Sequence, residues 1–166
     1  AGAGTLIGRH MDKVAAEAAK VENAKVETVT DANGLKAVKV TFNNGILFKV
    51  GKYALQSGAI TDLTQFSSVL KNNPTCSVDI QGYASSDGSD DVNLKLSQNR
   101  ATAVKNFLVN SCSVPSSQCK NAVGYGETNL VTNADGSENR EASRRVEVYL
   151  YASQAMVDAA NNGTLQ

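Results

Sequence analysis

Residues 80–104 read IQGYASSDGSDDVNLKLSQNRATAV, and this stretch joins a strand, a polar loop and the start of a long helix. The strand pattern ends at Gly82, and the run of serine, aspartate and glycine after it is typical of a loop. A helical pattern begins near Val92 and continues to Asn110. The rest of the chain also alternates between strand and helix patterns. A strand followed by a long helix is therefore the unit around which the other elements can pack.

One face of the expected helix carries polar side chains where a core would need apolar ones. Steps of three and four residues place Asn93, Ser97, Arg100, Val104 and Phe107 on one side of a helix. Val104 and Phe107 suit a core, but the other three bring an amide, a hydroxyl and a guanidinium. A guanidinium that faces inward needs a counter-charge, because the desolvation of an unpaired ion is very costly.

Two interpretations of Arg100 are open at this point. The guanidinium could form an internal ion pair with Asp87, Asp90 or Asp91 in the preceding loop, which is the commoner arrangement for inward charges. Alternatively, it could join the backbone N–H groups and the positive dipole of a helix N-terminus to receive the carboxylate of a ligand.

Four motifs follow one another along the chain: G-Y-A-S-x-x-G, N-x-x-L-S-x-x-R-A-x-x-V, G-Y-G-E and R-x-x-S-R-R-V-E-V. In order and spacing they resemble the OmpA-like C-terminal domain, a family that includes outer-membrane protein A, the peptidoglycan-associated lipoprotein and flagellar stator proteins. The resemblance covers roughly residues 38–150. Four ordered motifs are far more specific than any one of them.

The resemblance implies a function without catalysis, the binding of peptidoglycan through the diaminopimelate of its stem peptide. Arg100 matches the family's arginine for this ligand, whereas Ser85 stands where the family has an aspartate and Ser143 where it usually has an asparagine. Diaminopimelate presents an ammonium and a carboxylate, so a site needs both an anion and a set of donors. We hypothesise that Asp87 binds the ammonium while Arg100 holds the carboxylate.

Further residues complete the expected site. Phe48 matches an aromatic position at the rim of the family's pocket, although simple core packing explains it equally well. Arg144 resembles the first motif arginine; it could reach the rim or the glycan, or it could pair with Glu127 or Glu141. The expected peptidoglycan-binding residues are Phe48, Ser85, Asp87, Asn93, Ser97, Arg100 and Arg144. The alternative function is an OmpA-like protein-interaction or spacer module that has no affinity for peptidoglycan.

The pattern along the chain predicts an α+β fold, a two-layer sandwich in which helices pack on one face of a mixed β-sheet, as in the OmpA-like βαβαβ arrangement. Two alternating segments flank a DANG turn and indicate a hairpin. Helical spacing predicts a core helix over 57–70. The expected strands are 24–30, 35–42, 77–82, 122–125 and 144–151.

Three segments are expected along the chain. Residues 1–23 form a glycine- and alanine-rich segment with a short helix, 24–152 form the OmpA-like domain, and 153–166 form a C-terminal helix and tail. Within the first segment we expect disorder up to Arg9 and an amphipathic helix from His10 to Asn23.

Composition excludes several other classes of protein. Sixteen basic and sixteen acidic residues give a formal net charge of zero, and no basic cluster indicates nucleic acid as a partner. No apolar run of about 18 residues predicts a membrane-spanning helix. The resemblance places the domain on the periplasmic side of a Gram-negative outer membrane, joined to that membrane through a region missing from this chain. Nothing in the sequence specifies an oligomer.

No enzyme activity, cofactor or metal site is expected. His10 is the only histidine, so a catalytic pair would have to recruit it from the N-terminal helix, far from the polar loop. Asp87, Ser89 and Asp91 imitate the first positions of a calcium loop, but Val92 stands where such a loop requires glycine.

Cysteine placement leaves the redox state open. Cys76, Cys112 and Cys119 lie before a strand, after a helix and before the next strand. A bridge between Cys112 and Cys119 is the natural pairing in an oxidising compartment. Closing this short loop would stabilise the folded state by about 2 kcal/mol. Three reduced thiols are the alternative, since connectivity does not follow from spacing.

Overall fold

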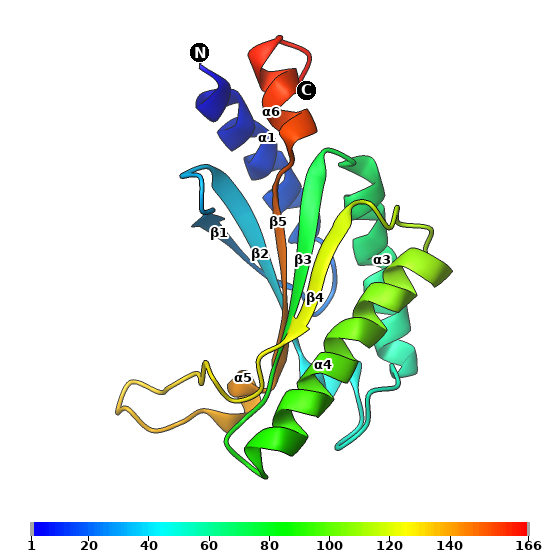
Figure 1. Ribbon diagram of the computed structural model, residues 1–166, viewed down its shortest axis with the longest axis vertical. Helices are drawn as coiled ribbons and strands as arrows, with labels where there is room; N and C mark the ends of the chain where they lie inside the picture. Colours follow the sequence, from blue (N-terminus) through cyan, green and yellow to red (C-terminus); the bar gives the residue numbers. More distant parts are fainter. Residues whose placement is uncertain (1, 166) are drawn as a thin grey trace.

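A computed structural model of the chain describes residues 2–165 and shows a five-stranded sheet with helices on it (Figure 1). In chain order the elements are α1 (Ala3–Ala18), β1 (Lys25–Thr30), β2 (Lys36–Asn43), α2 (Asn44–Leu47), α3 (Ser57–Asn72), β3 (Cys76–Tyr83), α4 (Asp90–Asn106), the π-helical turn η1 (Phe107–Ser111), β4 (Cys119–Gly124), α5 (Arg140–Ser143), β5 (Arg145–Ala152) and α6 (Gln154–Asn161).

The sheet is mixed, with the strand order β1-β2-β5-β3-β4. β3 and β4 run parallel and are joined through α4, whereas every other neighbouring pair is antiparallel. A parallel pair needs such a crossover connection, and the predicted hairpin of the first two strands forms with β1 beside β2. The predicted α+β fold, with a mixed sheet and helices packed on it, is therefore confirmed.

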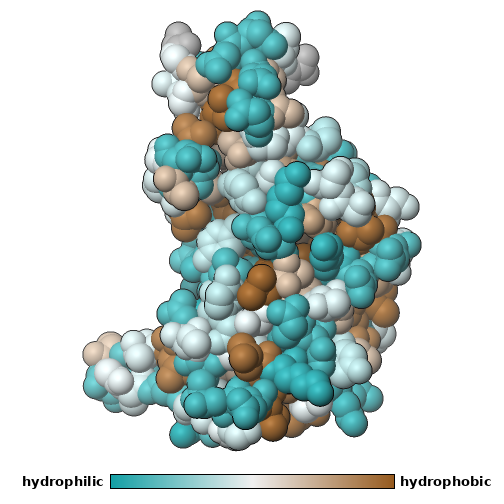
Figure 2. All heavy atoms as spheres, in the orientation of Figure 1, coloured by the Kyte–Doolittle hydropathy of each residue, from teal (hydrophilic) through white to brown (hydrophobic). Residues whose placement is uncertain are grey.

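The core lies between the sheet and its helices. Val40 of β2, Val148 of β5 and Ile80 of β3 are paired across three strands, and all three are fully buried. Apolar residues of α1, α3, α4 and α6 join them in one continuous cluster. On the surface in view, brown apolar residues form small groups among polar ones (Figure 2). Alternation along the strands therefore separates a buried face from a polar one.

The N-terminal segment differs from expectation. We predicted disorder up to Arg9, but α1 already begins at Ala3, and Ile7 is only 1% exposed. Ile7, Met11 and Val14 form one buried stripe, and α1 packs mainly on β2 and α6. Two glycines at Gly4 and Gly8 masked this stripe in the sequence, because glycine weakens a helical pattern. The boundary expected at residue 24 stays a prediction, and the core extends across it.

Helix α4 is capped and lies very close to the sheet. Ser89 accepts a hydrogen bond from the backbone N–H of Val92, so the helix begins at Asp90, slightly before the expected start. Gly82 and Gly124 face its backbone: a Cβ added at Gly124 would lie 2.1 Å from the nitrogen of Gln98. Two residues without side chains therefore set the distance between α4 and the sheet, and with it the position of Arg100.

The three cysteines are buried free thiols in the structure. Cys112 and Cys119 are thus not bonded among the described residues, and their pairing stays a prediction for oxidised protein. Burial, aided by the charge of Glu17, raises the pKa of the Cys76 thiol to about 12, and burial also raises the pKa of Cys119.

Alkaline pH should destabilise the fold through Cys76. The unfolded thiol ionises near pH 9.0 and the folded one near 12, so the stabilisation is complete below pH 9 and is lost as the pH rises towards 12. We expect the free energy of unfolding, measured with urea in reducing buffer, to fall between about pH 8 and pH 10.5. Cys76→Ala should reduce this slope without abolishing it, because burial also raises the pKa of Tyr83 and Tyr151. An unchanged slope in Cys76→Ala would contradict the assignment.

Candidate functional site

A pocket of about 510 Å³ opens where β3 ends and the polar loop begins. Six of the seven residues predicted for the site line it, namely Phe48, Ser85, Asp87, Asn93, Arg100 and Arg144. They come from four separate segments. The crossover through α4 and the return of β5 bring these segments to the end of the sheet where β3 ends and β5 begins. The seventh residue, Ser97, lies outside the lining.

Arg100 is the buried cation of this pocket. The residue is 6% exposed, and its guanidinium lies 5.0 Å from the ring centroid of Phe48. Nε donates to the carbonyl oxygen of Lys52 at 2.9 Å and Nη2 to that of Lys49 at 3.3 Å. Among the described residues no carboxylate forms an ion pair with Arg100. The ion pair with a loop aspartate that we considered for Arg100 is therefore not made, and other N–H groups of the guanidinium remain for a ligand.

Phe48 belongs to the core and also lines the pocket. Its ring is 2% exposed and belongs to the hydrophobic core, yet the residue also lines the pocket beside Arg100. A guanidinium over an aromatic face gains about 0.5–2 kcal/mol, so the ring also fixes the orientation of the arginine.

Asp87 lies in the pocket with two arginines on its carboxylate. Nη1 of Arg144 lies 3.4 Å from one oxygen, and Nε of Arg140 lies 3.1 Å from the other. Arg144 also donates to the hydroxyl of Ser85 at 3.2 Å, and Ser85 is 3% exposed. Arg144 thus pairs with Asp87, and not with Glu127 or Glu141, the partners considered as the alternative to a role at the pocket rim.

Asn93 and Ser97 hold the backbone around the pocket. The amide of Asn93 donates to the carbonyl oxygens of Ser85 and Asp87, at 3.2 and 2.8 Å. The hydroxyl of Ser97 accepts a hydrogen bond from the backbone N–H of Gly126 at 2.9 Å. Asn93 and Ser97 therefore form hydrogen bonds with loop backbone, which explains why they can be buried.

The electrostatics of the pocket favour an anion. Burial lowers the pKa of Arg100, and the nearby positive charge of Arg144 lowers it further. Both effects oppose the charged form of Arg100, and an anionic ligand between the two guanidinium groups would relieve them. On the loop, Glu138 accepts hydrogen bonds from the backbone and hydroxyl of Ser86, which lower the pKa of its carboxyl.

Asn44 and Glu141 are among the lining residues that were not predicted for the site. Asn44 is 3% exposed; its amide nitrogen donates to the carbonyl of Tyr83, but its Oδ1 is buried without a hydrogen-bond partner. Glu141 is exposed on α5 and takes part in no ion pair within the described chain. No local pattern marks either residue, because both reach the pocket only through the packing of α5 against residues 43–44.

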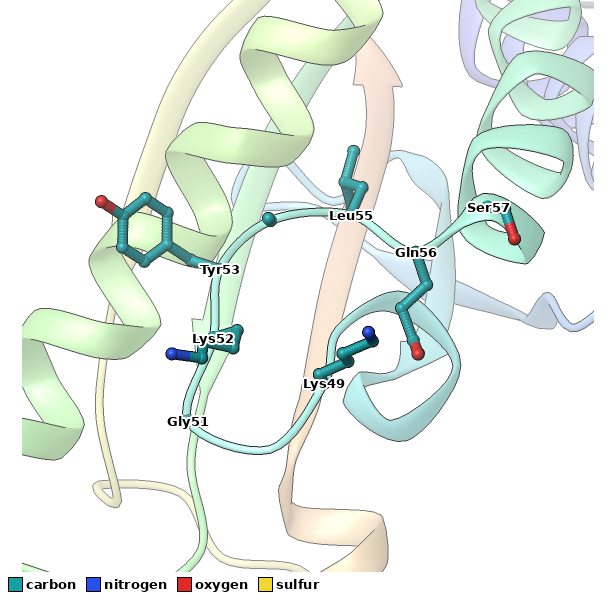
Figure 3. Close-up of a pocket in the computed structure, with 8 residues that line it drawn as sticks. Lys49, Gly51, Lys52, Tyr53, Leu55, Gln56 and Ser57 are labelled. Carbon is teal, nitrogen blue, oxygen red and sulfur yellow. The ribbon is translucent and has the colours of Figure 1, made fainter.

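A second hollow, of about 750 Å³, runs along residues 49–57 next to this pocket (Figure 3). The figure shows the loop as an open arch with Tyr53 directed away from it. Lys49 and Lys52 line the hollow, and none of its lining residues is acidic. The backbone carbonyl groups of Lys49 and Lys52 accept hydrogen bonds from Arg100, so this loop helps to hold Arg100 in the charged pocket.

The described residues include no cluster of three or more histidine, cysteine or carboxylate side chains that could hold a metal ion. None of the helices in residues 2–165 has the length and apolar character needed to cross a bilayer. The arrangement is that of a binding domain of the α+β class with a charged pocket at one edge of its sheet.

Comparison with known proteins identifies the family of this domain. The model of the OmpA family matches residues 47–144, more than half of the chain. Outer membrane porin F of Pseudomonas aeruginosa is 33% identical over 135 residues, which cover 80% of this chain and 38% of the porin. The chain therefore belongs to the OmpA family, as its motifs indicated.

Two other comparisons agree with this assignment. The peptidoglycan-associated lipoprotein of Brucella melitensis is 30% identical over 107 residues, 62% of each protein. The chain spans less than two thirds of the length of either curated relative. The solved structure of the cell wall anchor of the T6SS from Pseudomonas aeruginosa superposes with a TM-score of 0.66 at 21% identity, covering 86% of this chain and 97% of that one. This likeness supports the fold.

Proposed function

We propose that this domain binds peptidoglycan without catalysis, through the diaminopimelate of the stem peptide, and so anchors an outer membrane to the cell wall. The observation that carries the proposal is Arg100, a buried guanidinium that lines a pocket and forms no ion pair with a carboxylate of the described chain. A buried charge without a counter-charge is costly. A ligand carboxylate is the natural counter-charge, because a guanidinium binds carboxylates through paired hydrogen bonds.

Family membership supports the same ligand. A relative that matches 62% of the chain is named for its association with peptidoglycan, and another is named as an outer membrane protein. Three of the four family motifs contribute residues to the lining of this one pocket, among them Ser85, Asn93, Arg100 and Arg144. A wall polymer is therefore the ligand class that both lines of argument favour.

The shape of the domain suits an anchor. Both labelled ends of the chain lie beside α1 and α6, at the pole opposite α5 and the first turns of α4 (Figure 1). The pocket is built at that opposite pole, between α5, the polar loop and α4. Peptidoglycan bound in the pocket would therefore lie on the far side of the domain from the ends, consistent with a place between the outer membrane and the wall on the periplasmic side.

Substitution of Arg100 should weaken binding strongly. In calorimetric titration with a soluble stem tripeptide that ends in diaminopimelate, we expect Arg100→Ala to lose about ten- to a hundredfold in affinity, since a charge-assisted hydrogen bond contributes about 1.5–3 kcal/mol. A tripeptide with lysine in place of diaminopimelate lacks the distal carboxylate and should lose a similar amount with the unchanged protein.

Arg9→Ala is the matched control for this titration. Arg9 is an exposed arginine on α1, and its loss should leave affinity unchanged. Since Arg100 also binds the 49–52 loop, thermal unfolding of each variant separates a folding defect from a binding defect. Equal affinity of Arg100→Ala and the parent protein, both folded, would rule out the site. If the parent protein binds no stem peptide at all, a protein-interaction module becomes the better account.

A further inference from the structure

The pocket contains two charges of opposite sign that have no ionic partner in the described chain. Arg100 is the positive one, and Glu141 on α5 is the negative one. The other two charged residues of the lining, Asp87 and Arg144, pair with each other, so Arg100 and Glu141 are the lining charges that a ligand would meet uncompensated. A ligand end that carries both an anion and a cation would match them.

Asp87, which we hypothesised to bind the ligand's ammonium, is poorly placed to attract a cation. Its carboxylate faces the guanidinium groups of Arg144 and Arg140 at 3.4 and 3.1 Å. An ammonium beside Asp87 would therefore also lie near two positive charges, and like charges at short range cost energy. Ser85, the other polar residue of this loop in the pocket, supplies a hydroxyl and no charge.

Asn44 adds a hydrogen-bond acceptor to the lining that contains Glu141. Its Oδ1 is buried without a partner, although the residue is 3% exposed and lines the pocket. A buried acceptor that lacks a donor costs free energy, and a ligand N–H would satisfy it. The two residues are linked through backbone contacts: Asn43 Nδ2 donates to the carbonyl of Glu141 at 3.2 Å, and the N–H of Asn44 donates to the carbonyl of Arg144 at 2.9 Å.

We propose that Glu141 and the Oδ1 of Asn44 form the cation subsite of this pocket, and that they bind the distal ammonium of the zwitterionic ligand whose carboxylate Arg100 holds. This assignment rests on the proposed function. In this assignment the ammonium binds residues of α5 and α2, and not Asp87 in the loop after β3. An ammonium group brings three donors, so one carboxylate and one amide oxygen can bind it together.

A chemical double-mutant cycle tests the subsite. One axis is the ligand: a diaminopimelate-containing stem tripeptide with a free distal amine, and the same tripeptide with that amine acetylated. The other axis is the protein: the parent and Glu141→Gln. We expect the parent to bind the free amine about tenfold more tightly than the acetylated form, and Glu141→Gln to bind both with nearly equal affinity. Non-additivity of this kind measures the contact between the two groups directly.

Controls separate this proposal from the one on which it rests. Asp91→Asn removes an exposed carboxylate of α4 that lies outside the pocket lining, and it should keep the full preference for the free amine. If Glu141→Gln keeps that preference while Asp87→Asn abolishes it, the ammonium binds Asp87 and our assignment is wrong. Should the parent bind both ligands equally, the pocket has no cation subsite. If the parent binds neither ligand, the proposed function fails and the subsite fails with it.

Discussion

Gly124→Ala is expected to lower the free energy of unfolding by about 3 kcal/mol or more, which is the upper end of the range for overpacking. The added Cβ would lie 2.1 Å from the nitrogen and 2.5 Å from the Cα of Gln98. Both atoms belong to the backbone of α4, so no side chain can rotate away. The helix would have to move off the sheet, and its contacts with β3 and β4 would open.

Binding should weaken in the same variant. Arg100 lies on α4 within a turn of Gln98, and its guanidinium is fixed by Phe48 and by the carbonyl groups of the 49–52 loop. Displacement of the helix would break this alignment. Urea denaturation gives the stability change, and calorimetry with the stem tripeptide gives the loss of affinity.

Gly8→Ala provides the matched control. Gly8 lies within α1, and a Cβ added there meets no atom within 4 Å. Alanine favours a helix over glycine by about 0.8–1.0 kcal/mol, so this variant should be neutral or slightly more stable. If both substitutions have the same effect, the close approach of α4 to β4 does not limit stability.

The fold was predictable because its decisive patterns are local. Alternation in β2 and β5 and helical spacing in α3 indicated which residues face the core, and each of these elements formed where it was expected. α1 was recognised only in part, because its first turns are rich in glycine. Its stability comes from Ile7 and Met11 packing against a distant strand, a tertiary contribution that local propensity does not contain.

Most residues proposed for the site line one pocket, but their partners were not predictable. The motifs, the family resemblance and the chemistry of the expected ligand together pointed to six residues that line one pocket. The pairing of Asp87 with Arg144 joins residues 57 positions apart, and no local pattern encodes it. The same holds for Glu141 and Asn44, which enter the pocket through the docking of α5. Which charged residues of a site are paired and which are not depends on long-range packing. This distinction therefore requires the structure.

Glu147→Gln is expected to destabilise the protein by about 3–5 kcal/mol, the cost of breaking a buried ion pair by removing one partner. Glu147 of β5 is 3% exposed, and its carboxylate lies 2.7 Å from Nε of Arg145, which is 6% exposed. Arg145 also lies over the ring of Tyr83, with its guanidinium carbon 4.2 Å from the centroid. Without Glu147, the buried guanidinium would keep its charge and lose its counter-ion.

Tyr149 gives this prediction a second readout. Its hydroxyl donates to Glu147 at 2.7 Å, and burial together with that carboxylate raises the pKa of the tyrosine. Glu147→Gln removes the negative charge, so spectrophotometric titration should show the pKa of Tyr149 closer to its ordinary value of about 10. A purely steric effect of the substitution would leave this titration unchanged.

Glu27→Gln is the control for an exposed pair on the same face of the sheet. Glu27 lies 3.4 Å from Lys39 with its side chain 44% exposed, and exposed pairs contribute about 0.2–1 kcal/mol. The double variant Arg145→Met, Glu147→Leu should regain much of the lost stability, because apolar residues of similar volume can replace a buried pair. A loss below about 1 kcal/mol in Glu147→Gln would mean that water reaches Arg145 and compensates its charge.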